Sequence, residues 1–321
     1  MLKAPRKPKK VWRKIRSAVV TGATGMLGAT LVRVLLREGI AVTAVIRPGS
    51  KKRGNLPEEA EGLTVVECDL SKLRDLTLPK KIDAFFHFAW EGPYGERRND
   101  PELQQQNVRN VMNAVRTAAR LGAKVFLGAG SQAEYGRQTG KLTPETPCRP
   151  ETEYGKAKFD ASVLGRALAS ALRIDFIWTR ILSVYGPFDN DYTLISSAIR
   201  SLLKTGRFAA TAGEQVWDYL FSEDAAEWFY RLAVCGRGNE TYVLGSGEER
   251  TLRDYLTELK EIAAPEGEIA FGEIPYREGQ VMYMTADIGK TVSDTEYAPK
   301  TAFSDGIAKT LDWIRKTPEK G

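Results

Sequence analysis

Residues 17–179 alternate between short apolar runs and stretches with helical spacing, and this alternation narrows the folds open to the chain. The run SAVVT at residues 17–21 ends at a glycine cluster, which is typical of a buried parallel strand. Residues 26–38 then carry apolar side chains at helical spacing, namely Leu27, Leu31, Val34 and Leu35. Such alternation with short connections predicts a parallel sheet with helices on both faces. We expect an α/β, doubly wound Rossmann sheet.

Further elements follow the same pattern, and the pattern loosens after residue 186. We expect strands at residues 40–46, 63–67, 82–88, 123–127 and 174–179, and long helices over residues 100–121 and 153–172. Residues 17–185 would thus form the dinucleotide-binding domain. Residues 186–321 would be mainly a smaller α/β substrate lobe, with a strand near residues 240–245 returning to the main sheet.

A glycine-rich loop, GATGMLG, joins the first strand to the first helix. Glycine permits a tight turn and a close approach of backbone to a pyrophosphate, whose charge the helix N-terminus favours. A purely structural turn is the alternative, but the place of the loop after the first strand favours a dinucleotide. The cofactor contacts expected here come from Gly22, Thr24, Gly25, Met26, Leu27 and Gly28.

The end of the second strand bears on which nicotinamide cofactor is used. An NAD site usually has Asp or Glu there to bind the ribose 2′-hydroxyl, but this chain has the sequence IRPGSKKR. Arg47, Ser50 and Arg53 could bind a 2′-phosphate through charge-assisted hydrogen bonds, the alternative being a solvated basic loop. NADP(H) is therefore preferred and NAD(H) stays possible. Further cofactor contacts are expected from Asp69, Leu70, Phe88, Ala89, Trp90 and Lys158.

A tyrosine and a lysine four residues apart lie on one face of the second long helix. Lys158 would lower the pKa of the Tyr154 phenol from about 10 by favouring the phenolate. Ser131 follows the fifth strand and could hydrogen-bond a substrate oxygen beside Tyr154. Asn107 could order backbone or water near Lys158. These four residues are the expected catalytic group.

Charge and composition exclude several other functions. Residues 1–16 hold eight Lys and Arg and no acid, whereas the remaining 305 residues hold 39 basic and 41 acidic ones. A nucleic-acid-binding face is therefore not expected. The single histidine and the three scattered cysteines argue against a metal site, a Ser-His-Asp triad and disulfides, and fit a cytoplasmic protein. No apolar run is long enough for a membrane span, which takes about 18 residues.

The chain resembles the extended short-chain dehydrogenase/reductases, which include the NAD-dependent epimerases and dehydratases of nucleotide sugars. The resemblance is carried by Asn107 and by the motifs TGATGMLG, HFAW, GSQAEYG, YGKAK and RILSVYGP. The resemblance runs from about residue 17 to the C-terminus. It implies catalysis by Ser131, Tyr154 and Lys158 and a nucleotide-sugar pocket in the C-terminal lobe. It also implies a homodimer formed through the helices near residues 101–121 and 153–172.

Departures from the family pattern point to the reaction. Sugar 4,6-dehydratases carry an Asp-Glu pair after the catalytic Ser or Thr, where this chain has Gln132 and Ala133. Epimerase-reductases of the GDP-fucose synthase type carry a Cys at the Ala133 position and a downstream His; both are absent here, which disfavours epimerisation at carbons 3 or 5. Two reactions of the family need only Ser, Tyr, Lys and the nicotinamide, namely net reduction of a 4-keto-6-deoxy nucleotide sugar and 4-epimerisation. We expect an NADP-dependent reductase of a nucleotide-linked 4-keto-6-deoxy sugar, with a 4-epimerase and a non-catalytic NADP-binding regulator as alternatives.

The resemblance also suggests which residues meet the substrate. In the family, Asn often precedes the second Tyr-Gly pair and Arg opens a later Arg-Asp-Tyr, where this chain has Ser183 and Trp217. Diphosphate contacts are thus in doubt at both positions, and His87 is expected to be structural or to line the cofactor. The expected substrate contacts are Trp90, Glu91, Ser131, Gln132, Tyr154, Arg180, Trp217 and Arg277.

The basic segment of residues 1–16 precedes the first strand of the expected enzyme fold. Val11, Trp12 and Ile15 interleave its charges, so it could associate weakly with an anionic membrane surface or an acidic partner. A solvated or surface-docked extension is the favoured interpretation.

Overall fold

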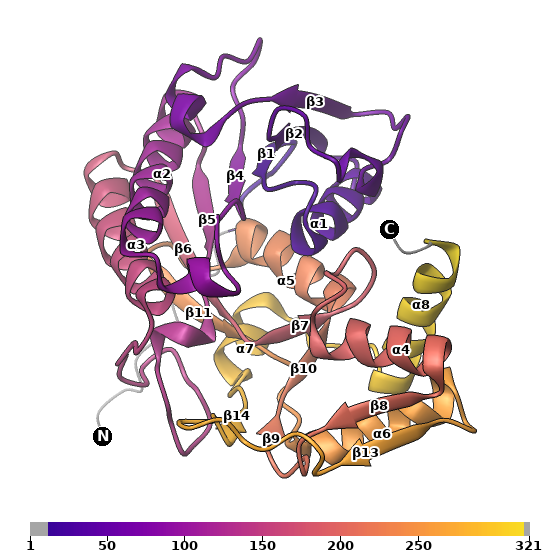
Figure 1. The fold of residues 1–321 in the computed structure, drawn as a ribbon. Helices are drawn as coiled ribbons and strands as arrows, with labels where there is room; N and C mark the ends of the chain where they lie inside the picture. Colours follow the sequence, from indigo (N-terminus) through magenta and orange to yellow (C-terminus); the bar gives the residue numbers. More distant parts are fainter. Residues whose placement is uncertain (1–11, 318–321) are drawn as a thin grey trace, which may run out of the picture.

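The computed structural model describes residues 12–317, and its centre is a seven-stranded parallel sheet (Figure 1). The strand order is β11-β6-β5-β4-β1-β2-β3. The bounds of these strands are β1 Ser17–Thr21, β2 Ala41–Ile46, β3 Leu63–Glu67, β4 Ala84–His87, β5 Val125–Ala129, β6 Asp175–Ile181 and β11 Glu240–Leu244. Strand β11 returns to the sheet and pairs in parallel with β6, as the sequence predicts. The doubly wound α/β fold is confirmed.

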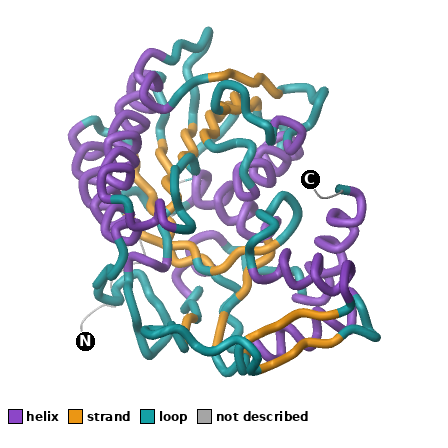
Figure 2. The backbone as a smooth tube through the Cα atoms, viewed as in Figure 1, coloured by secondary structure: helices purple, strands orange, loops and turns teal. Residues whose placement is uncertain are grey.

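Helices cover both faces of this sheet (Figure 2). Helices α2 (Pro101–Arg120) and α3 (Glu153–Ala171) pack together on one face, and α1 (Met26–Arg37), α5 (Ser222–Cys235) and α7 (Gly289–Thr295) lie on the other. Asp100 caps α2, because its carboxylate accepts a hydrogen bond from Leu103 N, and the Thr152 hydroxyl caps α3 in the same way at Gly155 N. Four short 3₁₀ turns complete this part: η1 Arg53–Asn55, η2 Leu70–Asp75, η3 Glu96–Asn99 and η4 Gln132–Glu134.

The C-terminal elements build a second apolar cluster beside the carboxyl ends of the strands. Its helices are α4 (Leu194–Thr205), α6 (Leu252–Ala263) and α8 (Phe303–Lys316). Its strands pair in three small sheets: β7 Ser183–Tyr185 with β10 Tyr219–Phe221, β8 Arg207–Ala210 with β13 Glu268–Phe271, and β9 Val216–Trp217 between β12 Arg250–Thr251 and β14 Tyr283–Met284. Strand β11 is part of the main sheet, and α5 and α7 pack on it. After residue 186 the chain therefore passes more than once between the main sheet and the C-terminal apolar cluster.

The described end of the basic segment is anchored to the fold. Arg13 donates from Nε and Nη2 to the Asp175 carboxylate, at 2.9 and 2.7 Å, and from Nη1 to Gly236 O. Ile15 packs against the main core. Trp12 is exposed. The expectations about residues 1–11 lie outside the described residues. Within residues 12–317, no helix has the length and apolarity to cross a bilayer.

Candidate active site

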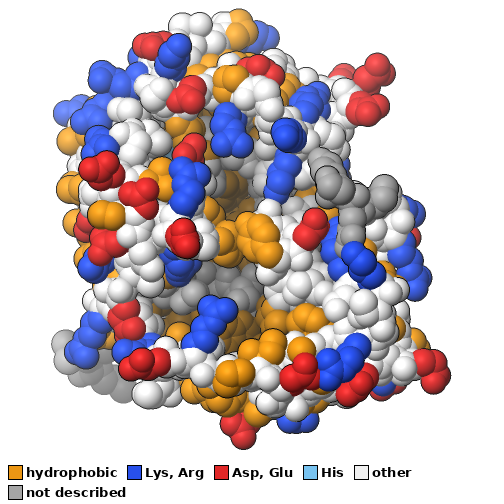
Figure 3. Space-filling view, viewed as in Figure 1, with side chains coloured by type: hydrophobic (Ala, Val, Ile, Leu, Met, Phe, Trp, Pro, Cys, Tyr) orange, Lys and Arg blue, Asp and Glu red, His pale blue; other side chains and the backbone are white. Residues whose placement is uncertain are grey.

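A cavity of about 540 Å³ opens where the carboxyl ends of the sheet strands face the C-terminal cluster. Figure 3 shows this face of the molecule hollowed, with hydrophobic side chains along the rim. The cavity walls come from the β1–α1 loop, from the segments after β4 and β5, from α3, and from residues 181–195 and 217–219. Ligands bind at this edge of doubly wound sheets, because the strand order reverses there.

The glycine loop forms one end of the cavity. Gly22 has a φ of +67°, and an added Cβ would lie 2.6 Å from Ala89 N, so only glycine fits between this loop and the segment after β4. At Gly25, by contrast, an added Cβ would meet only Gly22 O, at 3.5 Å, and would fill cavity space before α1. Helix α1 has no acid in its first turn. These residues therefore fit the pyrophosphate of a dinucleotide.

The basic loop after β2 lies beside this end of the cavity, but outside its lining. Arg47 is exposed, with Nη1 4.0 Å from Glu91 Oε1. The Ser50 and Thr24 hydroxyls are 3.4 Å apart. Arg53 Nη1 donates to Pro57 O at 3.5 Å. Asp69, Leu70 and Ala89 also lie outside the lining, and Asp69 caps η2 through a hydrogen bond from Ser71 N.

The structure brings Ser131, Tyr154 and Lys158 together on the cavity wall, each at most 9% exposed. Ser131 is placed by η4, where it forms a capping box with Glu134. Tyr154 and Lys158 project from successive turns of α3. Gly22, Gly25, Met26, Leu27, Gly28, Phe88, Trp90, Gln132 and Trp217 line the same cavity.

Burial raises the pKa of the Tyr154 phenol, and a hydrogen bond with Ser131 and the positive charge of Arg98 oppose this effect. Lys158 is not among the groups that shift this pKa in the structure. Lys158 Nζ lies 5.7 Å from the Tyr154 ring centroid, whereas Arg98 Cζ lies 4.3 Å above the ring. Arg98 therefore lies closer to the Tyr154 ring than Lys158 does.

Lys158 instead faces Trp90 and the end of β5. Its Nζ donates to Ala129 O at 2.6 Å and lies 3.6 Å from the Trp90 ring centroid. Burial lowers the pKa of Lys158 to about 7. The ammonium thus titrates near neutral pH, in the range useful for passing a proton.

Asn107 orders the backbone of Glu91 at the cavity edge. Its amide accepts from Glu91 N at 3.0 Å and donates to Glu91 O at 2.9 Å. Neither Asn107 nor Glu91 lines the cavity, and the Glu91 side chain pairs with Arg97 at 3.3 Å. Asn107 therefore shapes the segment after β4 that carries Trp90.

Arg180 was expected to contact the substrate, but it lies outside the cavity lining. Its Nε donates to Glu134 Oε2 at 2.9 Å, and its guanidinium stacks 4.7 Å from the Tyr135 ring centroid. The fully buried Glu134 also accepts from Trp178 Nε1 and from Ser131 N, both at 2.9 Å. Arg180 is thus the counterion of the carboxylate that fixes Ser131.

Ser183 and Trp217, which stand where the family often has Asn and Arg, contact each other. Trp217 Nε1 donates to Ser183 Oγ at 2.9 Å, and both residues line the cavity. Arg277 is exposed and lies outside the lining. His87 is buried, with Nδ1 2.8 Å from Thr21 Oγ1, and burial lowers its pKa to about 3, so it is a neutral structural residue.

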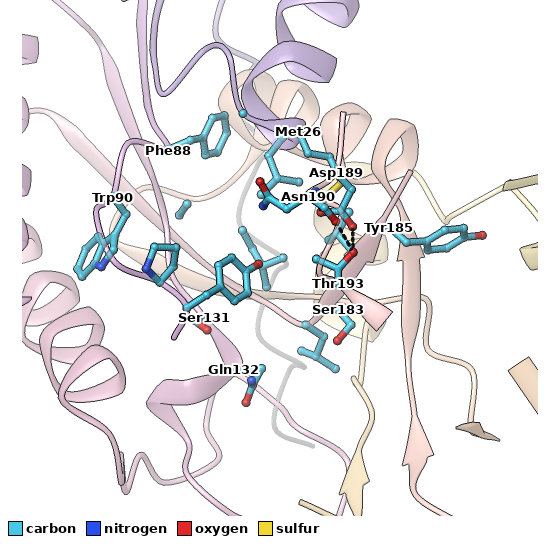
Figure 4. A pocket seen from close by; sticks show the side chains of 18 of the residues that line it. Met26, Phe88, Trp90, Ser131, Gln132, Ser183, Tyr185, Asp189, Asn190 and Thr193 are labelled. Atoms are coloured by element: carbon cyan, nitrogen blue, oxygen red, sulfur yellow. Dashed lines mark hydrogen bonds between the residues drawn. The ribbon is translucent and has the colours of Figure 1, made fainter. Parts of the chain in front are cut away.

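Sequence reasoning missed several residues that line the cavity across from Ser131, Tyr154 and Lys158. Asp189, Asn190 and Thr193 lie opposite Phe88 and Trp90 in Figure 4. Asp189 accepts from Thr193 Oγ1 at 2.8 Å and from Asn190 N at 2.7 Å, and burial raises its pKa to about 6. Tyr94 and Arg98 were also missed. No local motif marks these residues, because loops that only the fold brings together carry them.

A glycine loop before α1 and a Ser-Tyr-Lys group on one cavity define the class of nicotinamide-dependent oxidoreductases. Residues 18–245 match the model of the NAD dependent epimerase/dehydratase family, and the chain belongs to this family. It is therefore an NAD(P)-dependent enzyme of the oxidoreductase type.

Three relatives show how far the similarity extends. The chain is 27% identical to dTDP-glucose 4,6-dehydratase of Streptomyces antibioticus over 310 residues, covering 92% of each protein. It is 26% identical to UDP-glucose 4-epimerase of Mycolicibacterium smegmatis, covering 92% of this chain and 98% of the relative. Among solved structures, MoeE5 in complex with UDP-glucuronic acid and NAD has a TM-score of 0.81 at 26% identity, covering 94% and 99% of the two chains.

Proposed function

We propose that this enzyme is an NADP(H)-dependent reductase of the C4 carbonyl of a nucleotide-linked ketosugar. The observation that carries the proposal is the Ser131, Tyr154 and Lys158 group on a cavity where Gln132 and Ala133 follow the serine. Neither of these two side chains can donate or accept a proton as a dehydratase pair does. A 4-keto-6-deoxy sugar is the form that the family resemblance implies.

The chain's own residues would divide the work as follows. When bound, the cofactor supplies hydride to the carbonyl carbon. Tyr154 donates its phenolic proton to the carbonyl oxygen, which Ser131 holds by a hydrogen bond. Because burial raises the pKa of Tyr154, the phenol keeps its proton at neutral pH until the oxygen takes it. Lys158, whose pKa burial lowers to about 7, lies on the same cavity wall and would supply the replacement proton.

A 4-epimerase is the second candidate, and two observations favour it. It needs the same three residues, and one curated relative is named as a UDP-glucose 4-epimerase. The solved MoeE5 complex is with NAD, which suits an enzyme that retains its cofactor. The basic loop with Arg47, Lys52 and Arg53, which has no acid at the end of β2, supports NADP(H) and hence net reduction.

We further propose that the enzyme is a homodimer formed through α2 and α3. Val163 and Leu164 on α3 are each 50% exposed, which is unusual for neighbouring aliphatic side chains on a helix that already packs on the sheet. Size-exclusion chromatography with light scattering tests this proposal, and Val163→Glu should give a monomer.

The function is tested by incubating the protein with NADPH and CDP- or dTDP-4-keto-6-deoxyglucose. The reductase consumes NADPH in proportion to product, and Tyr154→Phe should reduce the rate by about 10²–10⁴-fold while leaving NADPH affinity unchanged. Interconversion of 4-hydroxy epimers without net NADPH consumption would establish the epimerase instead. Unchanged turnover in Tyr154→Phe would remove the proposed mechanism.

A further inference from the structure

A second, smaller cavity adjoins the segment that lines the active-site cavity. Its volume is about 160 Å³, and its walls come from α1, from Pro187 and Phe188, and from the start of α5. The next two residues of the chain, Asp189 and Asn190, line the active-site cavity instead. Pockets for larger ligands begin at about 300 Å³, so the size of this second cavity suits a small ion rather than a nucleotide.

Arg33 of α1 brings to this cavity a cation that has no acidic partner. Its Nη1 donates to Ala29 O at 3.0 Å and to Asn55 O at 2.7 Å, and its Cζ lies 4.5 Å from the Phe188 ring centroid. No carboxylate among residues 12–317 pairs with it, and burial lowers the pKa of its guanidinium. Its Nε and Nη2 donors have no protein acceptor in this part of the chain.

The start of α5 adds further hydrogen-bond donors. Ser222 lines the second cavity and is 1% exposed, and its hydroxyl has no hydrogen-bond partner in the described part of the chain. Phe221, which precedes this 14-residue helix, provides no side-chain cap for the first backbone N–H groups. Because the N-terminus of a helix carries partial positive charge, this end of α5 also favours an anion.

The other charged side chains of the lining are already paired. Arg37 donates to Glu38 at 3.3 Å and to Glu227 at 2.8 Å. Glu223, the one acid among the residues that line this cavity, pairs with Lys309 at 2.9 Å. The charge of Arg33 is therefore the one that the lining leaves without a counterion.

The free donors of Arg33 have the geometry that binds an oxyanion. Backbone carbonyls occupy Nη1, so Nε and Nη2 form a free edge, and such an edge binds two oxygens of one anion through parallel hydrogen bonds. We propose that the second cavity is a binding site for a small oxyanion of the phosphate type, held by Arg33 and the start of α5. The site shares no lining residue with the active-site cavity and does not depend on the proposed reaction.

Titration calorimetry with inorganic phosphate tests this site on the full chain. NADP⁺ is kept saturating, so that phosphate does not bind at the glycine loop, and sodium chloride at equal ionic strength is the blank. We expect one phosphate to bind with a Kd of about 1 mM or tighter. Arg33→Gln removes the charge and the free edge and should weaken binding by about tenfold or more, and Arg33→Lys, which keeps the charge, by about threefold.

Arg37→Gln is the matched control, because Arg37 belongs to the same helix and lines the same cavity but is already paired. It should change the phosphate affinity by less than about threefold. Absence of binding up to about 10 mM phosphate, or binding that persists unchanged in Arg33→Gln, would overturn the site. An equal loss in Arg33→Gln and Arg37→Gln would also overturn it, since general attraction to positive charge would then explain the binding. The melting temperature and NADP⁺ affinity of each variant verify that it folds.

Discussion

The ammonium group of Lys158 lies over the face of the Trp90 ring, 3.6 Å from its centroid. Trp90 is held in turn from α2, because its Nε1 donates to Gln104 Oε1 at 2.9 Å. The segment after β4 therefore supplies the surface on which a lysine of α3 is oriented. This links three elements of the fold to the position of one proposed catalytic group.

Replacing Trp90 should disturb Lys158 without removing it. A desolvated cation–ring contact contributes about 2 kcal/mol, so Trp90→Leu should lower kcat for ketosugar reduction by up to roughly thirtyfold. Trp90→Phe keeps a ring face and should lose less. Turnover is followed by NADPH absorbance, and Trp12→Leu, at an exposed position, is the control. Equal rates for Trp90→Leu and the unmodified enzyme would show that the contact is dispensable.

Lys158→Met should give a protein that is inactive but more stable. Burial lowers the pKa of Lys158 from 10.5 to about 7, so between these pH values the unfolded chain holds one more proton than the folded chain. The destabilisation is complete below about pH 7 and declines as the pH rises toward 10.5. We expect a gain of about 2–4 kcal/mol in unfolding free energy near pH 6.

Urea unfolding at several pH values measures this gain. Lys156→Met is the matched control, because Lys156 is an exposed lysine of the same helix, paired with Glu153. A gain that is independent of pH would mean that burial of the Lys158 charge is not its source.

Arg47→Asp should shift the cofactor preference from NADP(H) toward NAD(H). A carboxylate at the end of β2 repels a 2′-phosphate and can accept a hydrogen bond from a ribose 2′-hydroxyl. Fluorescence titration with NADPH and NADH should show the ratio of their affinities falling by about tenfold or more. Arg74→Asp makes the same change of charge on η2 and should leave the ratio unaltered. An unchanged ratio in Arg47→Asp would contradict the proposed 2′-phosphate site.

Glu134→Gln should destabilise the protein through the buried cluster around Arg180. Removing one charge of a buried pair leaves the other uncompensated and costs roughly 3 kcal/mol. The double variant Glu134→Gln with Arg180→Met removes both charges and should recover part of this loss in urea unfolding. If the double variant is less stable than the sum of the two single changes predicts, the pair is not the source of the effect.

The sheet and the shared helix face of Tyr154 and Lys158 were predictable from the sequence because their signals are local. Buried parallel strands appear as continuous apolar runs, and Tyr154 and Lys158 share a helix face by spacing alone. The predicted long helices, residues 100–121 and 153–172, agree with α2 and α3 to within a residue at each end. The return of β11 was also foreseen from its apolar pattern.

The charge environment of the site was not predictable, since it depends on contacts between distant segments. Arg97 and Arg98 are adjacent arginines that the sequence does not distinguish. In the structure Arg97 pairs with Glu91 outside the cavity, whereas Arg98 lines it. Arg180 was expected to contact the substrate, but Glu134, 46 positions earlier, already supplies its counterion. For the same reason, the sequence did not show that Arg98 lies 4.3 Å from the Tyr154 ring centroid, closer than Lys158 at 5.7 Å.

The attachment of Arg13 to Asp175 has a practical consequence. Asp175 begins β6, and Arg16 O accepts a hydrogen bond from Ala41 N at the start of β2, so the chain enters the fold at the amino edge of the sheet. The cavity lies at the opposite, carboxyl edge. Immobilising the enzyme through a tag placed ahead of residue 12 should therefore leave substrate access unhindered, whereas tethering through residues 187–193 should block it.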